Sequence, residues 1–269
     1  MEDKADKIEF KKFDFGGAEM NHILKTNNLY KEYGIKGFKT QVLNNISLTV
    51  EEGEFIAIMG PSGAGKTTLL NLLSTIDKPT KGEIILDGRD ITKMKSKELS
   101  QLRKDSIGFI FQDYSLLDNM NLMDNIALPL ALGHKKSKEI EEKVISIAEA
   151  FGLKEHLKKY PYELSGGQKQ RGAAARALIT NPSVIFADEP TGALDSKSSS
   201  ELLACLKKMN EEKKATIIMV THDALSASYT QKVYVLTDGE IRCQLNRGND
   251  RKEFYGRIID LLATLGGTR

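Results

Sequence analysis

The chain lacks any apolar run that approaches the roughly 18–20 residues needed to span a bilayer. Its longest strongly apolar stretches, such as Ala57–Met59 and Val184–Ala187, have only the length of a core strand. There is no excess of one charge, because 39 basic and 37 acidic side chains leave a net charge of +2, so composition gives no reason to expect nucleic acid as a partner. Only two cysteines occur, Cys205 and Cys243, and they form no CxxC pair. These absences favour a globular protein of the reducing cytosol.

Three segments follow one another along the chain. Residues 1–21 are polar without a sustained period, and we expect a flexible N-terminal extension; its charged start, Met1–Asp14, does not resemble a signal peptide. Residues 22–248 read as one α/β domain, because apolar runs such as Phe55–Met59 alternate with helical stretches, which predicts a parallel sheet with helical crossovers. Residues 249–269 predict an amphipathic helix.

Within the α/β domain, a helical period dominates from about Leu116 to Leu164 and predicts an inserted helical subdomain at about residues 112–168. Gly82–Leu86, the turn Asp87-Gly88 and Arg89–Ile91 predict a β-hairpin. The remaining expected strands are Ile23–Asn28, Thr40–Leu43, Ile46–Val50, Val184–Ala187 and Ala215–Val220. The expected helices outside the insertion are Thr67–Ser74 and Ser198–Asn210.

A glycine-rich loop follows the strand Phe55–Met59 and fits the pattern G-x-x-x-x-G-K-[ST]. Its glycines allow backbone N–H groups to surround phosphate oxygens, and the helix that opens at Lys66 adds its N-terminal dipole. The lysine is expected to reach the β- and γ-phosphates of a nucleotide, and the Thr67 hydroxyl to ligate Mg²⁺. The predicted phosphate-loop residues are Gly60, Pro61, Ser62, Gly63, Ala64, Gly65, Lys66, Thr67 and Thr68.

Two acids, Asp188 and Glu189, end the apolar strand Val184–Ala187. An acid at the carboxyl end of a parallel strand stands at the ligand-binding edge of the sheet. We expect Asp188 to hold Mg²⁺ through water and Glu189 to orient or deprotonate the attacking water, which is the acid–base task in phosphoryl transfer.

The pentapeptide Leu164-Ser-Gly-Gly-Gln168 opens a further helix, which Ser165 can cap. With this element the chain resembles the ABC ATPases, whose signature is LSGGQ. In that family the signature of one subunit completes the ATP site of another, so the resemblance implies a homodimer with two ATP molecules between the subunits. The residues expected to contact the partner's ATP are Ser165, Gly166, Gly167, Gln168 and Asp195.

The other elements of that family occur in order. Tyr33 matches the aromatic residue that stacks on adenine, with Tyr30 as the alternative. Gln112 matches the glutamine that senses Mg²⁺ and faces the permease, and Asp195 lies in the loop that crosses the dimer interface. His222 matches the histidine that contacts the γ-phosphate. The resemblance thus implies the catalytic residues Glu189, His222 and Lys66, and the Mg²⁺-binding residues Thr67, Gln112 and Asp188.

The resemblance covers residues 23–245 and implies an α/β fold: a P-loop NTPase (RecA-like) core with an antiparallel β subdomain and an inserted α-helical subdomain. Only 98 residues separate Lys66 from Ser165, which leaves no room for the long coiled coil of the ABC ATPases that act on DNA. An ABC factor that acts on the ribosome would carry two such cassettes, and this chain has space for one. The chain is therefore expected to power a transporter.

Several segments indicate which group of ABC transporters the chain resembles most. Gly108–Leu117 and Asn125–Leu130 are similar to the macrolide-export and lipoprotein-release ATPases. Ile185–Lys197, Thr216–Asp223 and the tail Gln244–Arg251 are similar to the bacitracin-resistance type. That type implies resistance to bacitracin or lantibiotic-type peptides, a permease on a separate chain, often a sensor histidine kinase reached through it, and a place at the cytoplasmic face of the cell membrane. The alternatives are related lipoprotein-release, macrolide-export and cell-division complexes.

Two segments leave alternatives open. Asp113–Met120 mixes apolar and polar residues where the core meets the helical insertion; either Tyr114 and at least one of Leu116 and Leu117 contact the permease, or the leucines are buried. For the tail, the apolar face packs on its own domain, or it contacts the permease or the second ATPase subunit. The residues of that face are Phe254, Ile258, Ile259, Leu261, Leu262 and Leu265.

Overall fold

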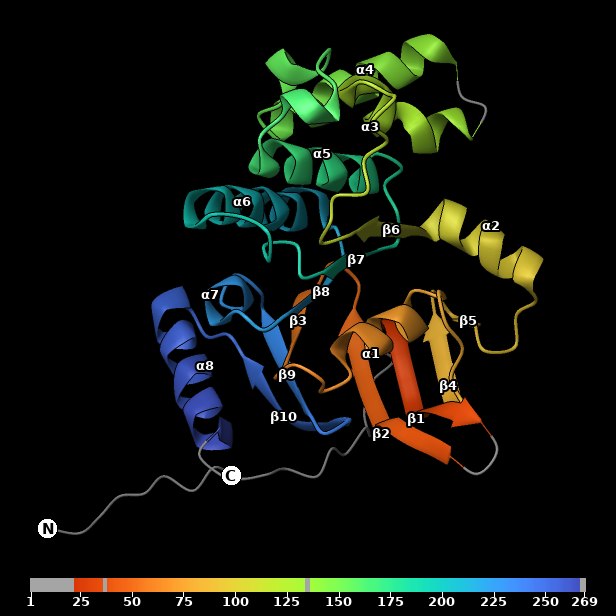
Figure 1. Cartoon of the computed structure of the whole chain (residues 1–269), viewed down its shortest axis with the longest axis vertical. Helices are drawn as coiled ribbons and strands as arrows, with labels where there is room; N and C mark the ends of the chain where they lie inside the picture. Colours follow the sequence, from red (N-terminus) through yellow and green to blue (C-terminus); the bar gives the residue numbers. More distant parts are fainter. Residues whose placement is uncertain (1–21, 36–37, 134–135, 267–269) are drawn as a thin grey trace, which may run out of the picture.

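The computed structural model describes residues 22–35, 38–133 and 136–266. The N-terminal extension expected at residues 1–21 lies outside the described residues. Two β-sheets and a set of helices make up the described chain (Figure 1).

The larger sheet has six strands in the order β10-β9-β3-β8-β7-β6. Its strands β3 (Phe55–Met59), β6 (Ile107–Ile110), β7 (Val184–Asp188), β8 (Ile217–Thr221) and β9 (Lys232–Thr237) pair in parallel, and β10 (Glu240–Asn246) runs antiparallel at the edge. All five residues of β3 and of β8 are buried, as is usual for a parallel sheet covered on both faces. The predicted parallel sheet is confirmed.

The smaller sheet is antiparallel, in the order β2-β1-β4-β5. It contains β1 (His22–Ile35), β2 (Phe38–Glu51), β4 (Lys81–Leu86) and β5 (Arg89–Asp90). The hairpin predicted at residues 82–91 is present as β4 and β5. The two short strands expected at residues 40–43 and 46–50 are one long strand, because bulges in the β1–β2 ladder absorb its irregular register without ending it.

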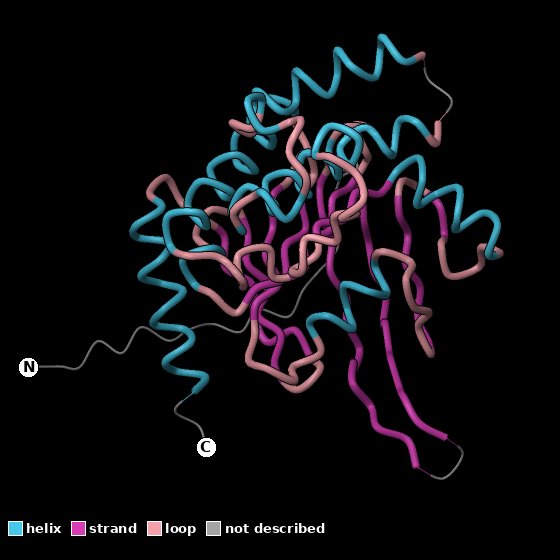
Figure 2. The backbone as a smooth tube through the Cα atoms, turned by 45° about the horizontal axis from the view of Figure 1, so that its top comes forward, coloured by secondary structure: helices cyan, strands magenta, loops and turns pink. Residues whose placement is uncertain are grey.

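Helices cover both faces of the larger sheet (Figures 1 and 2). Helix α1 (Lys66–Leu73) packs between the two sheets, together with α2 (Ser96–Ser106). On the other face lie α5 (Gly166–Leu178), α6 (Ser196–Lys213), α7 (Ala224–Ala227) and α8 (Arg251–Gly266). The predicted helical insertion is formed by α3 (Leu122–Ala131), α4 (Ser137–Ala150) and the 3₁₀ turns η1 (Lys154–His156) and η2 (Pro161–Glu163), which pack against α5.

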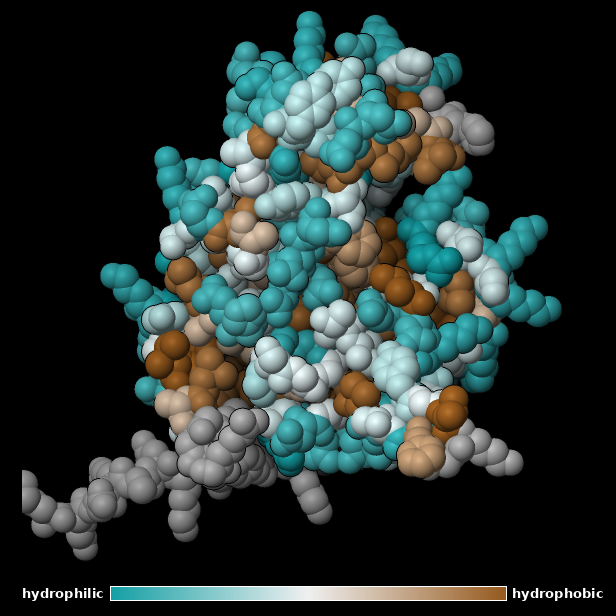
Figure 3. Space-filling view, viewed as in Figure 1, coloured by the Kyte–Doolittle hydropathy of each residue, from teal (hydrophilic) through white to brown (hydrophobic). Residues whose placement is uncertain are grey.

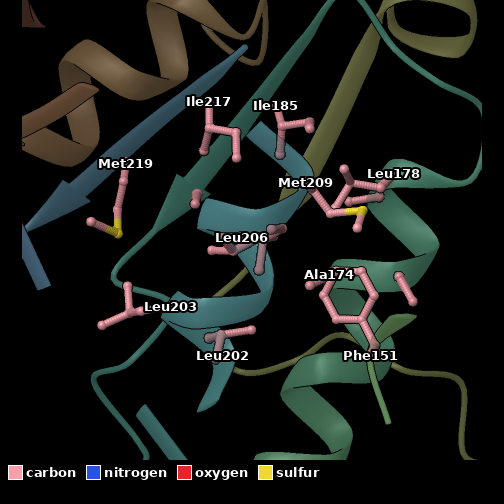
Figure 4. Packing of buried hydrophobic residues seen from close by; sticks show 14 of the residues in the cluster. Phe151, Ala174, Leu178, Ile185, Leu202, Leu203, Leu206, Met209, Ile217 and Met219 are labelled. Atoms are coloured by element: carbon pink, nitrogen blue, oxygen red, sulfur yellow. The ribbon is translucent and has the colours of Figure 1, made fainter. Parts of the chain in front are cut away.

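Alternation along the central strands divides the core into two clusters. Ile56 and Ile58 of β3 face α1 and the antiparallel sheet, whereas Ala57 and Met59 face the helical side. Figure 4 shows the cluster on the helical side of the sheet, in which Leu206 and Met209 of α6 lie between the strands and α5. The sheet is therefore fixed from both sides, and the loops at its edge start from rigid strands.

The tail helix α8 packs on its own domain. Phe254 and Ile258 are each 1% exposed and belong to the core cluster on the helical side. Ile259 is 42% exposed, so this residue of the predicted apolar face does not pack into the core as Phe254 and Ile258 do. The side chain of Leu265 is outside the described part of the chain.

Candidate functional site

The predicted site residues follow four neighbouring parallel strands at their carboxyl ends. The glycine-rich loop follows β3, Gln112 comes two residues after β6, Asp188 is the last residue of β7, and His222 comes directly after β8. These strands are adjacent in the order β3-β8-β7-β6, so the sheet brings the residues to one edge, where α/β folds bind ligands.

Close approach of the backbone explains two glycines of the phosphate loop. A Cβ on Gly60 would lie 2.0 Å from the carbonyl oxygen of Leu236 on β9. Gly65 has φ +98°, and a Cβ there would lie 2.8 Å from the Leu43 side chain. A larger residue at either position would displace the loop from the sheet, so the glycines fix its course.

The loop is closed by Lys66, which is buried at the start of α1. Its ammonium group donates hydrogen bonds to the carbonyl oxygens of Gly60 at 2.9 Å and Pro61 at 3.0 Å. A groove of about 270 Å³ opens beside it, and its lining residues are Val42, Gly63, Gly65, Lys66, Thr67 and Thr68. Five of the nine predicted phosphate-loop residues thus border one groove, and Val42 is a lining residue that the sequence did not indicate.

Tyr33 lies on β1, near the outer end of the antiparallel sheet, and is 43% exposed. Its hydroxyl donates to the Asp77 carboxylate at 2.7 Å, and the Lys31 ammonium lies 4.6 Å from its ring centre. Burial, and then the hydrogen bond to Asp77, raise the pKa of Tyr33. Asp77 thus holds the hydroxyl end of the ring, and Lys31 covers one of its faces. Sequence reasoning missed Lys31 and Asp77; the fold alone brings residues 44 positions apart together.

The pair Thr67 and Asp188 offers oxygen ligands for a cation. The threonine hydroxyl lies 3.4 Å from Asp188 Oδ1. Burial, and then the neighbouring Glu189 carboxylate, raise the pKa of Asp188, because both disfavour its charged form. A hydroxyl and a carboxylate are the hard oxygen donors that Mg²⁺ prefers, with phosphates and water completing its shell. The residues present therefore fit Mg²⁺ brought by a nucleotide.

Glu189 directly follows β7 in a left-handed conformation, with φ +42°. Its backbone N–H donates to the carbonyl of Val220 at 2.9 Å. This hydrogen bond attaches Glu189 to the neighbouring strand β8. Its carboxylate lies 3.0 Å from His222 Nδ1. The two residues that the sequence assigned to the same reaction thus form a pair, although 33 positions separate them in the chain.

Gln112 is exposed and lies beside the loop that follows Glu189. A Cβ on Gly192 would lie 3.1 Å from the Gln112 side-chain nitrogen and 3.3 Å from the Glu189 carbonyl oxygen. Gly192 therefore leaves space for the glutamine amide next to the loop that follows Glu189.

The signature forms the start of α5. Ser165 is the N-cap: its side chain accepts from the Gln168 N–H at 3.3 Å, and the Gln168 side chain accepts from the Ser165 N–H at 2.9 Å. The predicted cap is confirmed as a full capping box. Gln168 also contacts His156 Nε2 at 3.0 Å.

Asp195 is the N-cap of α6 and accepts hydrogen bonds from the N–H groups of Lys197 and Ser198. These bonds, led by the one from Ser198, lower the pKa of Asp195. A Cβ on Gly167 would lie 2.6 Å from Ser198 Oγ. The signature loop and the Asp195 loop are therefore packed together within one chain.

Among the described residues, the signature does not border the groove beside the phosphate loop. The residues that border the 270 Å³ groove all come from the phosphate loop, α1 and β2. A Cβ added to Gly166 or Gly167 would have Tyr114, Arg171, Leu194 and Ser198 as its nearest neighbours. Within the described residues, the structure thus assembles one half of the predicted ATP site at the sheet edge and places the other half elsewhere.

Comparison with protein families matches residues 43–192 to the family described as ABC transporter. The "Bacitracin export ATP-binding protein BceA" of Halalkalibacterium halodurans is 51% identical over 248 residues, which cover 92% of this chain and 98% of that protein. The "Macrolide export ATP-binding/permease protein MacB" of Syntrophobacter fumaroxidans is 42% identical over 81% of this chain and 31% of its own length.

A solved structure of an ATP-binding cassette is also similar. The dimer of MJ0796 in a post-hydrolysis state, bound to ADP and Pi, matches with a TM-score of 0.77 at 39% identity, and the match covers 84% of this chain and 99% of that chain. MJ0796 is a protein of Methanocaldococcus jannaschii.

Proposed function

This chain belongs to the ABC transporter family of ATP-binding proteins and is an ATPase, and we propose that two copies of it hydrolyse ATP at sites formed between them to drive a membrane permease on a separate chain. The observation that carries this proposal is the edge of the sheet, where the phosphate loop, the Thr67–Asp188 pair and the Glu189–His222 pair converge. A phosphate cradle next to an oxygen pair and a base is the arrangement that nucleotide hydrolysis requires.

Each residue then has a definite task. The loop N–H groups and Lys66 would bind the phosphates, Thr67 and Asp188 would hold Mg²⁺ with Gln112 beside them, and the Tyr33 ring would stack on adenine. Bound Mg²⁺ would supply charge neutralisation at the β- and γ-phosphates. Glu189 orients the attacking water and accepts its proton, and His222, paired with Glu189 at 3.0 Å, faces the γ-phosphate.

The second half of each ATP site is proposed to come from a second copy of the chain. The signature loop lies against other parts of its own chain and does not border the groove beside Lys66. Its glycines and the Ser165 hydroxyl are therefore proposed to contact the nucleotide bound by a second copy. The related cassette MJ0796 is a dimer that binds ADP and Pi, which supports a dimer of this chain in its ATP-bound state.

Replacing Lys66 with alanine tests the phosphate cradle. Binding of MgATP to the isolated chain is expected to weaken roughly 10- to 100-fold, because a hydrogen bond to a charged group contributes about 1.5–3 kcal/mol. Titration calorimetry measures this effect. The matched control is Lys232→Ala, since that side chain is only 14% exposed and pairs with Glu54 at the opposite end of the sheet; it should bind MgATP as the wild type does. Equal affinity in both variants would remove Lys66 from the site.

Since the similar protein BceA is named as a bacitracin export ATP-binding protein, we propose that this chain reaches the cytoplasmic face of the membrane through its permease. The described residues contain no helix long and apolar enough to cross a membrane. The proposed contact is the segment Asp113–Met120. Leu117 is 42% exposed there, whereas Leu116 is half-buried and approaches Gly172 of α5. Figure 3 shows hydrophobic residues surrounded by hydrophilic ones in the hollow between the helical insertion and α2, a pattern typical of a protein-binding surface.

Replacing Leu117 with glutamate should abolish co-purification with the permease and resistance in cells, while MgATP binding and the melting temperature of the isolated chain stay unchanged, because an exposed side chain contributes little to the fold. Leu132→Glu is the control: Leu132 is 60% exposed and lies at the end of α3, outside the segment. Normal assembly and resistance in the Leu117 variant would exclude the segment from the interface.

For the cargo, we propose peptide antibiotics of the bacitracin and lantibiotic type. The support is the 51% identity with a bacitracin export ATP-binding protein across nearly the full length of both chains. Deleting the gene should sensitise cells to these peptides and leave their sensitivity to macrolides unchanged. The reverse pattern would favour a macrolide exporter, for which the similarity to MacB is the corresponding observation.

A further inference from the structure

The side chain of the signature glutamine is held at both ends by its own chain. The Gln168 side-chain oxygen accepts from the Ser165 N–H at 2.9 Å, and the side-chain nitrogen lies 3.0 Å from His156 Nε2. Because a backbone N–H can only donate, the glutamine oxygen must face Ser165 and the amide NH₂ must face the histidine. Gln168 therefore connects the start of the signature to the helical insertion.

This orientation fixes the tautomer of His156. An amide NH₂ can only donate, so Nε2 must be the unprotonated acceptor, and the proton of the neutral ring must lie on Nδ1. Nδ1 is buried and has no hydrogen-bond partner among the described residues. A proton on Nε2 would set two donors face to face at His156. Turning the amide over would only move the same conflict to the Ser165 N–H, and unpaired buried donors are costly.

The backbone of His156 is attached on both sides to the helical insertion. The residue is half-buried in η1, and its chain neighbours Leu153 and Leu157 belong to the hydrophobic core. Its N–H donates to the carbonyl of Leu153 at 2.9 Å, and the Met123 N–H of α3 donates to the carbonyl of Leu157 at 2.9 Å. The imidazole therefore extends toward Gln168 from a turn that is fixed to α3.

We propose that His156, neutral and with its proton on Nδ1, is a positioning residue for ATP hydrolysis: through Gln168 it holds the Ser165 backbone, so that the signature keeps its orientation toward the ATP of the second copy. This inference rests on the proposed function. The Ser165 hydroxyl accepts from the Gln168 N–H at 3.3 Å, so its own proton stays free for a phosphate oxygen. Without the histidine, the glutamine side chain can rotate away, and the capping box loses one of its two bonds.

Replacing His156 with leucine is expected to lower turnover of the dimer roughly two- to tenfold, the effect of losing one neutral hydrogen bond. Binding of MgATP to the monomer should be unchanged, since the signature does not border the groove beside Lys66. His156→Gln should recover most of the turnover, because its side-chain oxygen can accept from the Gln168 amide. The matched control is Lys154→Met: Lys154 lies on the same turn and pairs with Glu149 of α4. This variant should turn over ATP as the wild type does.

A double-mutant cycle separates positioning from a merely structural role. Gln168→Leu should lower turnover at least as much as His156→Leu does. Adding His156→Leu to Gln168→Leu should then cause no further loss, because the histidine acts through the glutamine and the two effects are not additive. Additive losses would show that His156 only stabilises the helical insertion, and this result would overturn the proposal.

The tautomer provides a readout on the wild-type protein that does not depend on turnover. The chain has four histidines, and the ¹⁵N signals missing from the spectrum of His156→Gln identify those of His156. At a pH where the ring is neutral, these signals should show the proton on Nδ1. A proton on Nε2 in protein that hydrolyses ATP normally would overturn the positioning role and leave the proposed function intact. Protein that neither binds nor hydrolyses ATP would instead contradict the proposed function.

Discussion

Replacing Glu189 with glutamine is expected to lower ATP turnover about 10²- to 10⁴-fold, the usual contribution of a positioned general base. MgATP affinity should stay close to that of the wild type, because the phosphate loop and the Thr67–Asp188 pair are unchanged. Glutamine keeps the size of the side chain and can still contact His222, which lies 3.0 Å from the carboxylate. The ATP-bound dimer should then persist, since hydrolysis no longer ends it, and size exclusion with MgATP measures it directly.

Glu54→Gln is the control for this variant, because Glu54 is a largely buried carboxylate, paired with Lys232, at the opposite end of the sheet. It should hydrolyse ATP at the wild-type rate. Wild-type turnover in Glu189→Gln would show that another group activates the water.

Replacing Ser165 with alanine is expected to lower turnover about 10²- to 10³-fold, as for the loss of one donor to a developing charge in a transition state. Binding of MgATP to the monomer should stay intact, because Ser165 does not line the groove beside Lys66. Turnover and monomer affinity, measured on the same preparation, separate the two effects.

Ser165 also caps α5, and removing a cap costs about 1 kcal/mol of stability. Asn121→Ala controls for this loss, since Asn121 caps α3 by accepting from the Asp124 N–H at 2.9 Å and has no proposed contact with ATP. If Asn121→Ala lowers turnover as strongly, helix stability explains the result and the signature role fails. Gly167→Asp is a poorer probe, because its side chain would collide with Ser198 of the same chain.

The sequence predicted the parts of this protein that depend on local pattern. The loop from Gly60 to Thr67, the strand that ends at Asp188 and the cap at Ser165 each carry their chemistry in consecutive residues, and the structure has the corresponding strand–loop–helix, strand end and helix start. Their convergence at one edge followed from the rule that parallel strands end on the same side.

Other features could not be predicted because they depend on contacts between distant residues. The partners of Tyr33 and the contact of Arg176 with Ser115, 61 positions earlier, have no local signature. The continuous strand β2 was divided in the prediction, since bulges interrupt the alternation on which strand patterns depend. Strands β9 and β10 were not predicted, although Val233–Leu236 is a continuous apolar run that could have indicated the first of them.

Each ATP site is proposed to combine the phosphate loop of one copy with the signature of another, and mixing two inactive variants tests this composite site most directly. Glu189→Gln and Ser165→Ala chains are combined before ATP is added, and turnover is compared with that of each variant alone. In a mixed dimer, the Ser165→Ala chain supplies an intact Glu189 and the Glu189→Gln chain an intact signature, so one complete site forms. Turnover well above the sum of the two variants is the predicted result, and turnover equal to that sum would contradict the composite site.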